Sequence, residues 1–160
     1  MSTLDRRARQ LARSLAGVAV TGLLVLAFAT AADVLLRYAF AMPIRGFVDV
    51  VSLAGAVLLA ACLPHVVATR GNIAVDFLGR RIGPRAQYWL DVFGAFAVFV
   101  FFALMAWQYL RYTIDMKSTG EVMAILRWPV WPWWAAVTLF VFITALVALA
   151  TLTHREEASA

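Results

Sequence analysis

The chain carries four long apolar stretches that contain no charged residue. Each is about as long as the ~20 residues that an α-helix needs to cross a ~30 Å hydrocarbon core. Backbone polar groups in lipid must be paired within the chain, so such stretches form spanning helices. The charge-free stretches cover residues 15–32, 50–69, 92–110 and 128–153.

This pattern predicts an all-α integral membrane protein that forms a single membrane domain over residues 1–160. Only short connections remain between the spans, which leaves no room for a second, soluble domain. The predicted spans lie at about residues 15–38, 48–69, 88–110 and 130–152.

The second connection has a pattern of its own. Apolar residues recur at helical spacing between Ile73 and Ile82, Asn72 is a suitable N-cap, and Gly83-Pro84 ends the pattern. We therefore expect a short amphipathic helix over residues 72–82 that lies along the membrane surface.

The N-terminal segment allows two interpretations. An arginine-rich start precedes an apolar run, and Ala29-Thr30-Ala31 resembles the cleavage site of a secretory signal peptide. The apolar pattern, however, continues through Val34 to Phe40, which makes the stretch long enough to span. We favour a retained first helix, with a cleaved signal peptide as the alternative.

Composition supports a membrane protein. Hydrophobic residues make up 64% of the chain, charged residues 14%, and the mean hydropathy is +0.84, outside the range of soluble domains. The net charge of +5 comes from basic residues scattered over the ends and connections. A nucleic-acid surface would need a continuous basic patch, so we expect lipid and no nucleic acid among the partners.

The basic residues also predict an orientation. Nine of the fourteen lie in the two tails and the second connection, and five lie in the first and third connections. The richer side faces the cytoplasm, so we expect both termini there. Four tryptophans crowd the start of the fourth span, where indole rings are expected at the outer interface: Trp128, Trp131, Trp133 and Trp134.

The spans lack the usual sets of catalytic groups. A haem anchor needs facing histidines and a thiol relay needs cysteine pairs, whereas this chain has two histidines and the single Cys62. We therefore expect no enzyme activity and no catalytic, cofactor-binding or metal-binding residues. The carboxylate nearest to a span interior, Asp33, precedes Arg37 by four residues. An ion pair is favoured there over a proton relay or a partner contact.

Small residues recur along the second span at Ser52, Gly55, Ala56 and Ala60. Such a row lets helices approach closely in lipid, where van der Waals packing drives association. The row is a candidate helix-packing face, either within the chain or against a neighbouring subunit.

Three segments carry a resemblance to a known family. They are DVLLRYAFAMPIRGFVDV (33–50), with its Pro-hydrophobic-x-Gly turn, RGNIAVDFLGRRIGPRAQ (70–87) and STGEVMAILRWPVW (118–131). Together, in this order, they resemble the small, DctQ-like membrane subunit of TRAP (tripartite ATP-independent periplasmic) transporters. Ala41 and Asp49 stand where that family often has Asn and Glu, and a tryptophan often seen in the second helix is missing.

The resemblance implies a non-catalytic small permease subunit in a bacterial inner membrane. Such a subunit scaffolds a large elevator-type membrane subunit, which performs sodium-coupled uptake of organic acids delivered by a periplasmic binding protein. A self-sufficient small oligomeric transporter or channel is the alternative, and a membrane enzyme or redox anchor is a third interpretation.

On the expected periplasmic side, five charged residues are candidate contacts for the binding protein. Charges at the rim of an interface mainly affect encounter rate and salt dependence. For each residue the alternative is an ordinary solvated loop charge. The candidates are Arg37, Arg45, Asp49, Lys117 and Glu121.

Overall fold

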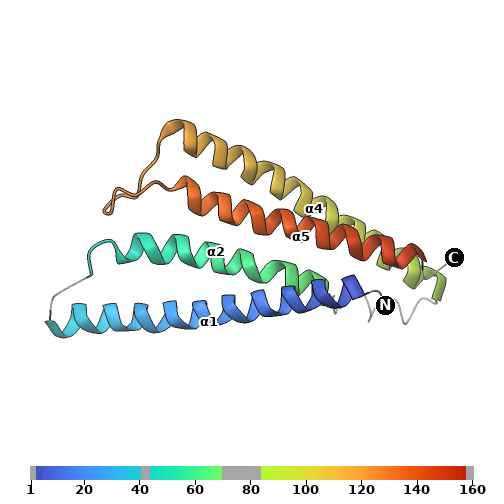
Figure 1. The fold of residues 1–160 in the computed structure, drawn as a ribbon, viewed down its shortest axis with the longest axis horizontal. Helices are drawn as coiled ribbons and strands as arrows, with labels where there is room; N and C mark the ends of the chain where they lie inside the picture. The colour runs from blue at the N-terminus through green and yellow to red at the C-terminus, as the bar shows by residue number, and fades with distance from the viewer. Residues whose placement is uncertain (1–2, 41–43, 70–83, 158–160) are drawn as a thin grey trace.

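The computed structural model describes residues 3–40, 44–69 and 84–157. These residues form four long helices, which confirms the predicted all-α class: α1 (Thr3–Phe40), α2 (Phe47–Ala68), α4 (Pro84–Thr119) and α5 (Trp131–Glu157) (Figure 1). The amphipathic helix expected at residues 72–82 lies outside the described residues.

Each helix contains a segment that is long and apolar enough to cross a membrane. These segments are Arg13–Phe40, Phe47–Ala68, Val92–Thr119 and Trp131–Ala150. The helix α4 continues well past Leu110, where the charge-free stretch ends at Arg111. A charged side chain limits how far a helix lies in hydrocarbon, but it does not interrupt the backbone hydrogen bonds that continue the helix.

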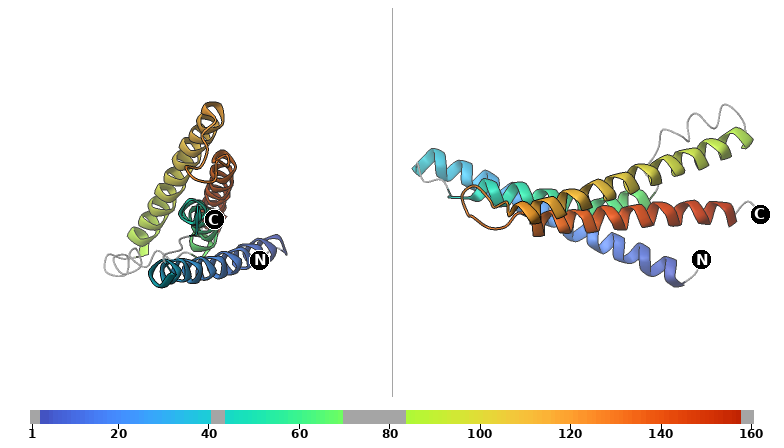
Figure 2. Two further views of the ribbon diagram at one scale, coloured as in Figure 1. Left: turned by 90° about the vertical axis from the view of Figure 1, so that its left-hand side faces the viewer. Right: turned by 90° about the horizontal axis from the view of Figure 1, so that it is seen from above.

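The four helices form an open row. The backbone of α1 approaches α2, α2 approaches α5, and α5 approaches α4, while no other two helices come as close within the described ranges. Figure 1 shows this order from one edge to the other, with both termini at the same end of the row. The end view and the view from above show that α1 and α4 remain apart as the two outer helices (Figure 2). The row therefore has two edges, one formed by α1 and one by α4.

Helix α5 is one of the two inner helices of the row, with α2 on one side and α4 on the other. Its side chains Val141 and Thr144 are almost fully buried. Small residues on both neighbours, Ala60 of α2 and Ala106 of α4, join Val137 and Val141 in one apolar cluster. The polar hydroxyl of Thr144 is satisfied within its own helix, where it donates to the Phe140 carbonyl at 2.7 Å.

The α4–α5 pair also has polar and aromatic contacts. The hydroxyl oxygens of Thr113 and Thr138 lie 3.0 Å apart across the two helices. Such interhelical hydrogen bonds contribute on average only about 0.6 kcal/mol in a membrane, so packing carries most of the stability. Trp134 of α5 stacks on Tyr109 and meets Tyr112 edge-on, with ring centroids 5.8 and 5.0 Å apart.

The α1–α2 pair is held close by small residues. Ala16 and Ala19 of α1 are buried, with Ala19 only 1% exposed. A Cβ atom added at Gly22 would lie 2.8 Å from Leu58 Cδ2 of α2. The absence of a side chain at Gly22 is therefore what lets Leu58 pack against the backbone of α1.

The four small residues of the predicted packing face on α2 have different surroundings in the structure. Ala60 belongs to the buried cluster and Ala56 packs against it. Ser52 is exposed and its hydroxyl donates to the Val48 carbonyl at 2.8 Å, while a Cβ added at Gly55 would meet nothing within 4 Å. Two of the four residues in the predicted packing face, Ala56 and Ala60, therefore pack inside the chain. That the face also packs against another subunit stays a prediction.

The first testable prediction concerns the α2–α5 contact. Replacing Ala60 by leucine adds bulk where α2, α4 and α5 converge, and overpacking of this kind costs about 1–3 kcal/mol. The same change at Ala97, which is exposed on α4, should leave the free energy of unfolding nearly unchanged. Unfolding by SDS titration of detergent micelles measures both variants, and equal stabilities would contradict the packing described here.

Candidate functional site

The charged candidates gather at the end of the row opposite the termini, where α1 turns into α2 and α4 turns into α5 (Figure 1). We call residues 44–49 and 120–130, together with the adjoining last turns of α1 and α4, the loop end. Its larger part is a short hairpin, residues 120–130, that joins α4 to α5. An isolated antiparallel bridge pairs Val122 with Pro129. The hairpin is thus an ordered element and presents its side chains in fixed positions.

Backbone hydrogen bonds close the hairpin. The Met123 amide donates to the Trp128 carbonyl at 2.8 Å, and the Val130 amide donates to the Glu121 carbonyl at 3.1 Å. Gly120 and Arg127 have positive φ values of 66° and 58°, which turn the chain at the start and at the far side of the hairpin. The Met123 side chain is only 4% exposed and fixes the hairpin to the helices.

The connection before α2 packs directly beneath this hairpin. Gly46 adopts a left-handed conformation with φ 75° just before α2 begins. A Cβ atom at this position would overlap Leu126 Cδ1 of the hairpin. Two separate reasons therefore favour glycine at position 46: its left-handed backbone conformation and the close approach of Leu126.

Asp49, in the first turn of α2, adds a polar link to the same hairpin. Its Oδ2 accepts a hydrogen bond of 2.9 Å from the amide of Ile125, 76 positions along the chain. A hydrogen bond to a charged acceptor contributes about 1.5–3 kcal/mol. A carboxylate at this position is also favoured by the partial positive charge at the N-terminus of α2.

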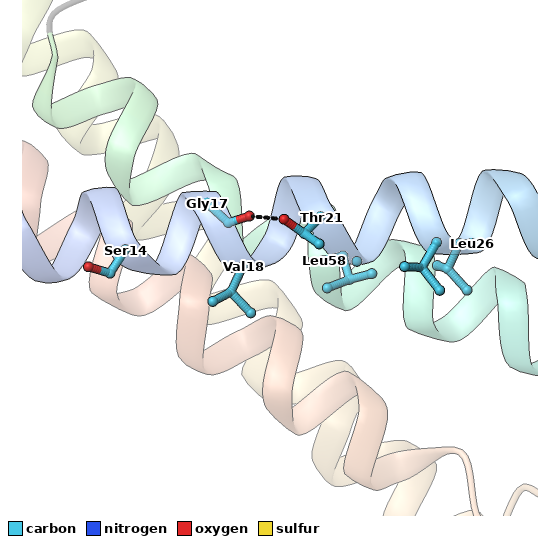
Figure 3. Close-up of a pocket in the computed structure, with 8 residues that line it drawn as sticks. Ser14, Gly17, Val18, Thr21, Leu26 and Leu58 are labelled. Carbon is cyan, nitrogen blue, oxygen red and sulfur yellow. Dashed lines mark hydrogen bonds between the residues drawn. The ribbon is translucent and has the colours of Figure 1, made fainter.

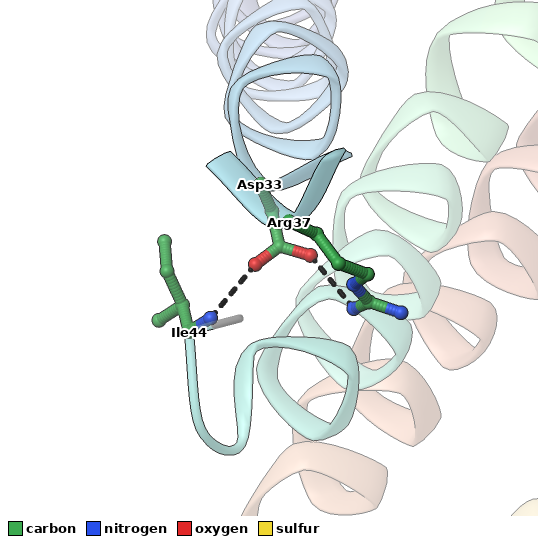
Figure 4. Close-up of polar contacts among 3 residues, drawn as sticks. All are labelled: Asp33, Arg37 and Ile44. Atoms are coloured by element: carbon green, nitrogen blue, oxygen red, sulfur yellow. Dashed lines mark hydrogen bonds and ion pairs between the residues drawn. The ribbon is translucent and has the colours of Figure 1, made fainter. Parts of the chain in front are cut away.

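Asp33 fixes the other side of the loop end (Figure 4). The predicted ion pair is confirmed, with Arg37 Nη2 3.0 Å from Asp33 Oδ2. The second carboxylate oxygen, Oδ1, accepts a hydrogen bond of 3.0 Å from the amide of Ile44. Asp33 is 3% exposed, and its buried charge is compensated by these two donors. The carboxylate therefore ties the end of α1 to the start of the following connection.

The five charged candidates consequently fall into two groups. Within the chain, Asp33 pairs with Arg37, the Ile125 amide donates to Asp49, and the Lys117 ammonium lies 5.2 Å from the centroid of the Trp131 ring. The side chains of the other two candidates are exposed and have no hydrogen bond or ion pair to the described part of the chain. These two are Arg45 and Glu121.

A groove lies along α1 in the body of the row (Figure 3). It has a volume of about 610 Å³, and its lining includes Gly17, Thr21, Val25 and, from α2, Leu58. The Thr21 hydroxyl donates to the Gly17 carbonyl at 2.9 Å. No charged side chain lines this groove, so it offers an apolar surface rather than acid–base or ion-binding chemistry.

Within the described residues, no three His, Cys, Asp or Glu side chains lie close enough together to hold a metal ion. The loop end instead offers an ordered surface with exposed apolar side chains and three charged side chains, those of Arg45, Glu121 and Arg127, that have no partner among the described residues. Its chemistry is suited to contact with another molecule.

Sequence reasoning missed how the loop end is joined. It identified Asp33 and Asp49 as charges near span ends, but the amides of Ile44 and Ile125 that bond to them carry no sequence signal. Gly46 did carry a signal, because the Pro-hydrophobic-x-Gly pattern places a glycine at a turn. Nothing in the sequence pointed to Leu126 as the side chain that packs on it.

The two positive-φ glycines give a matched test of this junction. Replacing either Gly46 or Gly120 by alanine imposes a backbone penalty of about 1–2 kcal/mol. Only G46A also drives a methyl group into Leu126, which should add about 1–3 kcal/mol, because a Cβ at Gly120 meets nothing within 4 Å. SDS-titration free energies of the two variants test this difference, and equal losses would show that the two connections are not in contact.

Comparison with known protein families matches residues 26–157 to the DctQ component of tripartite ATP-independent periplasmic transporters. No curated protein and no solved structure matches the chain. The matched residues include the C-terminal part of α1 (residues 26–40), the whole loop end and α5 to its end. The chain therefore belongs to the DctQ family and is a small membrane subunit of a TRAP transporter.

Proposed function

We propose that the subunit is a non-catalytic scaffold that packs against the large membrane subunit of its transporter. In this proposal the large subunit moves as an elevator and performs sodium-coupled uptake of an organic acid. A periplasmic binding protein delivers that substrate to the loop end. The subunit lies in the bacterial inner membrane with both termini in the cytoplasm.

The open row of helices carries this proposal. Among the described residues, helices α1 and α4 each approach one neighbour only. Both expose large apolar side chains along their length, among them Phe28 and Leu104. Helices in a membrane associate through close packing. A row with two free edges has far more surface for another membrane protein than a closed four-helix bundle of the same length.

The position of the termini supports the orientation. Both lie at the end opposite the loop end (Figure 1), which agrees with the distribution of basic residues along the chain. In this orientation Arg45 and Glu121 lie on the periplasmic side, where they are exposed and unpaired within the described residues.

The scaffold proposal predicts what happens when the chain is purified with and without its partner. The subunit should co-purify with the large membrane subunit of its transporter, and vesicles that contain only this chain should show no uptake. Uptake should require both membrane subunits together with the binding protein. Substrate flux through this chain alone would contradict the proposal and favour a self-sufficient transporter.

The docking proposal predicts an effect of charge reversal at the two unpaired residues. R45E and E121K should lower the initial rate of uptake at low ionic strength, because rim charges mainly set the rate of encounter. The loss should shrink as salt rises, since the screening length falls to about 8 Å at physiological ionic strength. Uptake assays on vesicles, with co-purification as the assembly readout, measure the effect.

The charge-preserving variants R45K and E121D are the matched controls and should retain uptake. Wild-type uptake in both reversal variants at low salt would contradict a docking role and would leave the two residues as ordinary solvated charges.

A further inference from the structure

The hairpin at the loop end presents three large apolar side chains to its surroundings. Val122, Ile125 and Trp128 are 46%, 58% and 56% exposed. The neighbouring Met123 is buried, with 4% of its surface exposed. Within residues 122–128, the loop buries one large apolar side chain and exposes three. This pattern resembles an amphipathic element more than a solvated connection.

The structure distinguishes Trp128 from two other tryptophans of its cluster, Trp131 and Trp134. Trp134 stacks against Tyr109 and Tyr112, and Trp131 lies under the Lys117 ammonium. These two rings are engaged in contacts within the chain. Trp128 lies outside α5, on the hairpin itself, and more than half of it is exposed.

The hairpin lies directly between two membrane-spanning segments. The apolar segment of α4 ends at Thr119 and that of α5 begins at Trp131. The eleven residues 120–130 therefore connect the ends of these two segments, and on the α4 side they follow a stretch, residues 111–119, that carries Arg111, Asp115 and Lys117. The exposed apolar side chains of the hairpin adjoin the start of the apolar segment of α5, where lipid is available as a partner.

Insertion of a loop as far as the acyl chains is costly when backbone groups lack partners, because the hydrocarbon contains no water to bond them. This hairpin has internal partners for several of its amides. The Met123, Arg127 and Val130 amides donate to carbonyls of the hairpin. The Ile125 amide donates to the Asp49 carboxylate. Asp49 thus satisfies the backbone group that belongs to the most exposed apolar residue of the hairpin.

A cationic side chain completes the surface. Arg127 is exposed and directly precedes Trp128. Long basic side chains at membrane boundaries keep their charge at the headgroup level while their aliphatic part lies along apolar surface. Phospholipid phosphates are the complementary charge for a guanidinium group in this position.

We propose that the hairpin is a lipid anchor whose partner is the phospholipid of the adjoining leaflet. Val122, Ile125 and Trp128 lie at the boundary between headgroups and acyl chains, and Arg127 contacts the lipid phosphates. Asp49 is a positioning residue that holds the hairpin in the conformation that inserts. This goes beyond the scaffold function and does not depend on it, because it concerns only this chain and the bilayer.

The experiment uses the full chain with Cys62 replaced by serine and one cysteine introduced for an environment-sensitive NBD fluorophore. The test positions are I125C, V122C and W128C, and the matched control is R45C, an exposed charged position at the same end. Each protein is reconstituted into phosphatidylcholine–phosphatidylglycerol vesicles. Quenching is compared between iodide in the water and a nitroxide attached near the glycerol end of the lipid acyl chain.

Amphipathic elements lie about 5–10 Å into the boundary between headgroups and acyl chains. The test fluorophores should therefore be quenched more by the lipid nitroxide than by iodide, and the R45C fluorophore should show the reverse. Fluorophores at the test positions that are as accessible to iodide as the control would overturn the proposal.

The role of Asp49 is tested on the I125C background. D49A leaves the Ile125 amide without its acceptor, so lipid quenching should fall and iodide quenching should rise. D49N keeps an acceptor oxygen and should preserve the lipid quenching. Equal quenching in D49A and the parent would remove the positioning role.

The same measurements on the transporter assembled with its other subunits separate lipid from protein as the partner. Lipid quenching that persists in the complex supports the anchor. Loss of both lipid and iodide quenching on assembly would overturn it, since a protein surface would then cover the hairpin.

Discussion

The two halves of this subunit are joined by a single seam between α2 and α5. Helices α1 and α2 form one hairpin and α4 and α5 form another, and the two approach each other only along this contact among the described residues. In the body of the seam, Ala60 packs with Val137 and Val141. At the loop end, Gly46 packs beneath Leu126 and Asp49 accepts the Ile125 amide. The open shape follows from it, because one seam cannot close a bundle.

The sequence predicted the parts of this structure that depend on local pattern. Charge-free stretches of spanning length predicted the helices, and the spacing of Asp33 and Arg37 predicted their ion pair. The order of the helices was not predictable, because apolar faces look alike when both lipid and protein are apolar. The contact between α2 and α5 could not be predicted either, since at the loop end it depends on the backbone amide of Ile125 and on the fit of Leu126 against Gly46. Only the small residues Ala56 and Ala60 indicated which face of α2 packs against another helix.

The open row connects the fold with a supporting role in transport. Its inner helices α2 and α5 each pack against two neighbours. Its outer helices expose Phe28 and Leu104, and its ordered loop end carries exposed charges beside apolar side chains. Rigid packing in the middle and free surface at the edges are properties that suit a subunit whose task is to hold a neighbour. Contact of the hairpin with lipid would fix the depth of the subunit in the bilayer. Contact of the outer helices with another protein would fix its orientation.

The arrangement of the row is tested most directly by the distance between its two outer helices. Nitroxide labels introduced at Phe28 on α1 and Leu104 on α4 can be measured by pulsed electron resonance in vesicles. Neighbouring helices pack with axes about 8–10 Å apart. An open row places two helices between the labels and predicts a separation of roughly three such spacings, about 24–30 Å. A separation near one spacing would show that α1 and α4 are neighbours in a closed bundle, and it would contradict the open row.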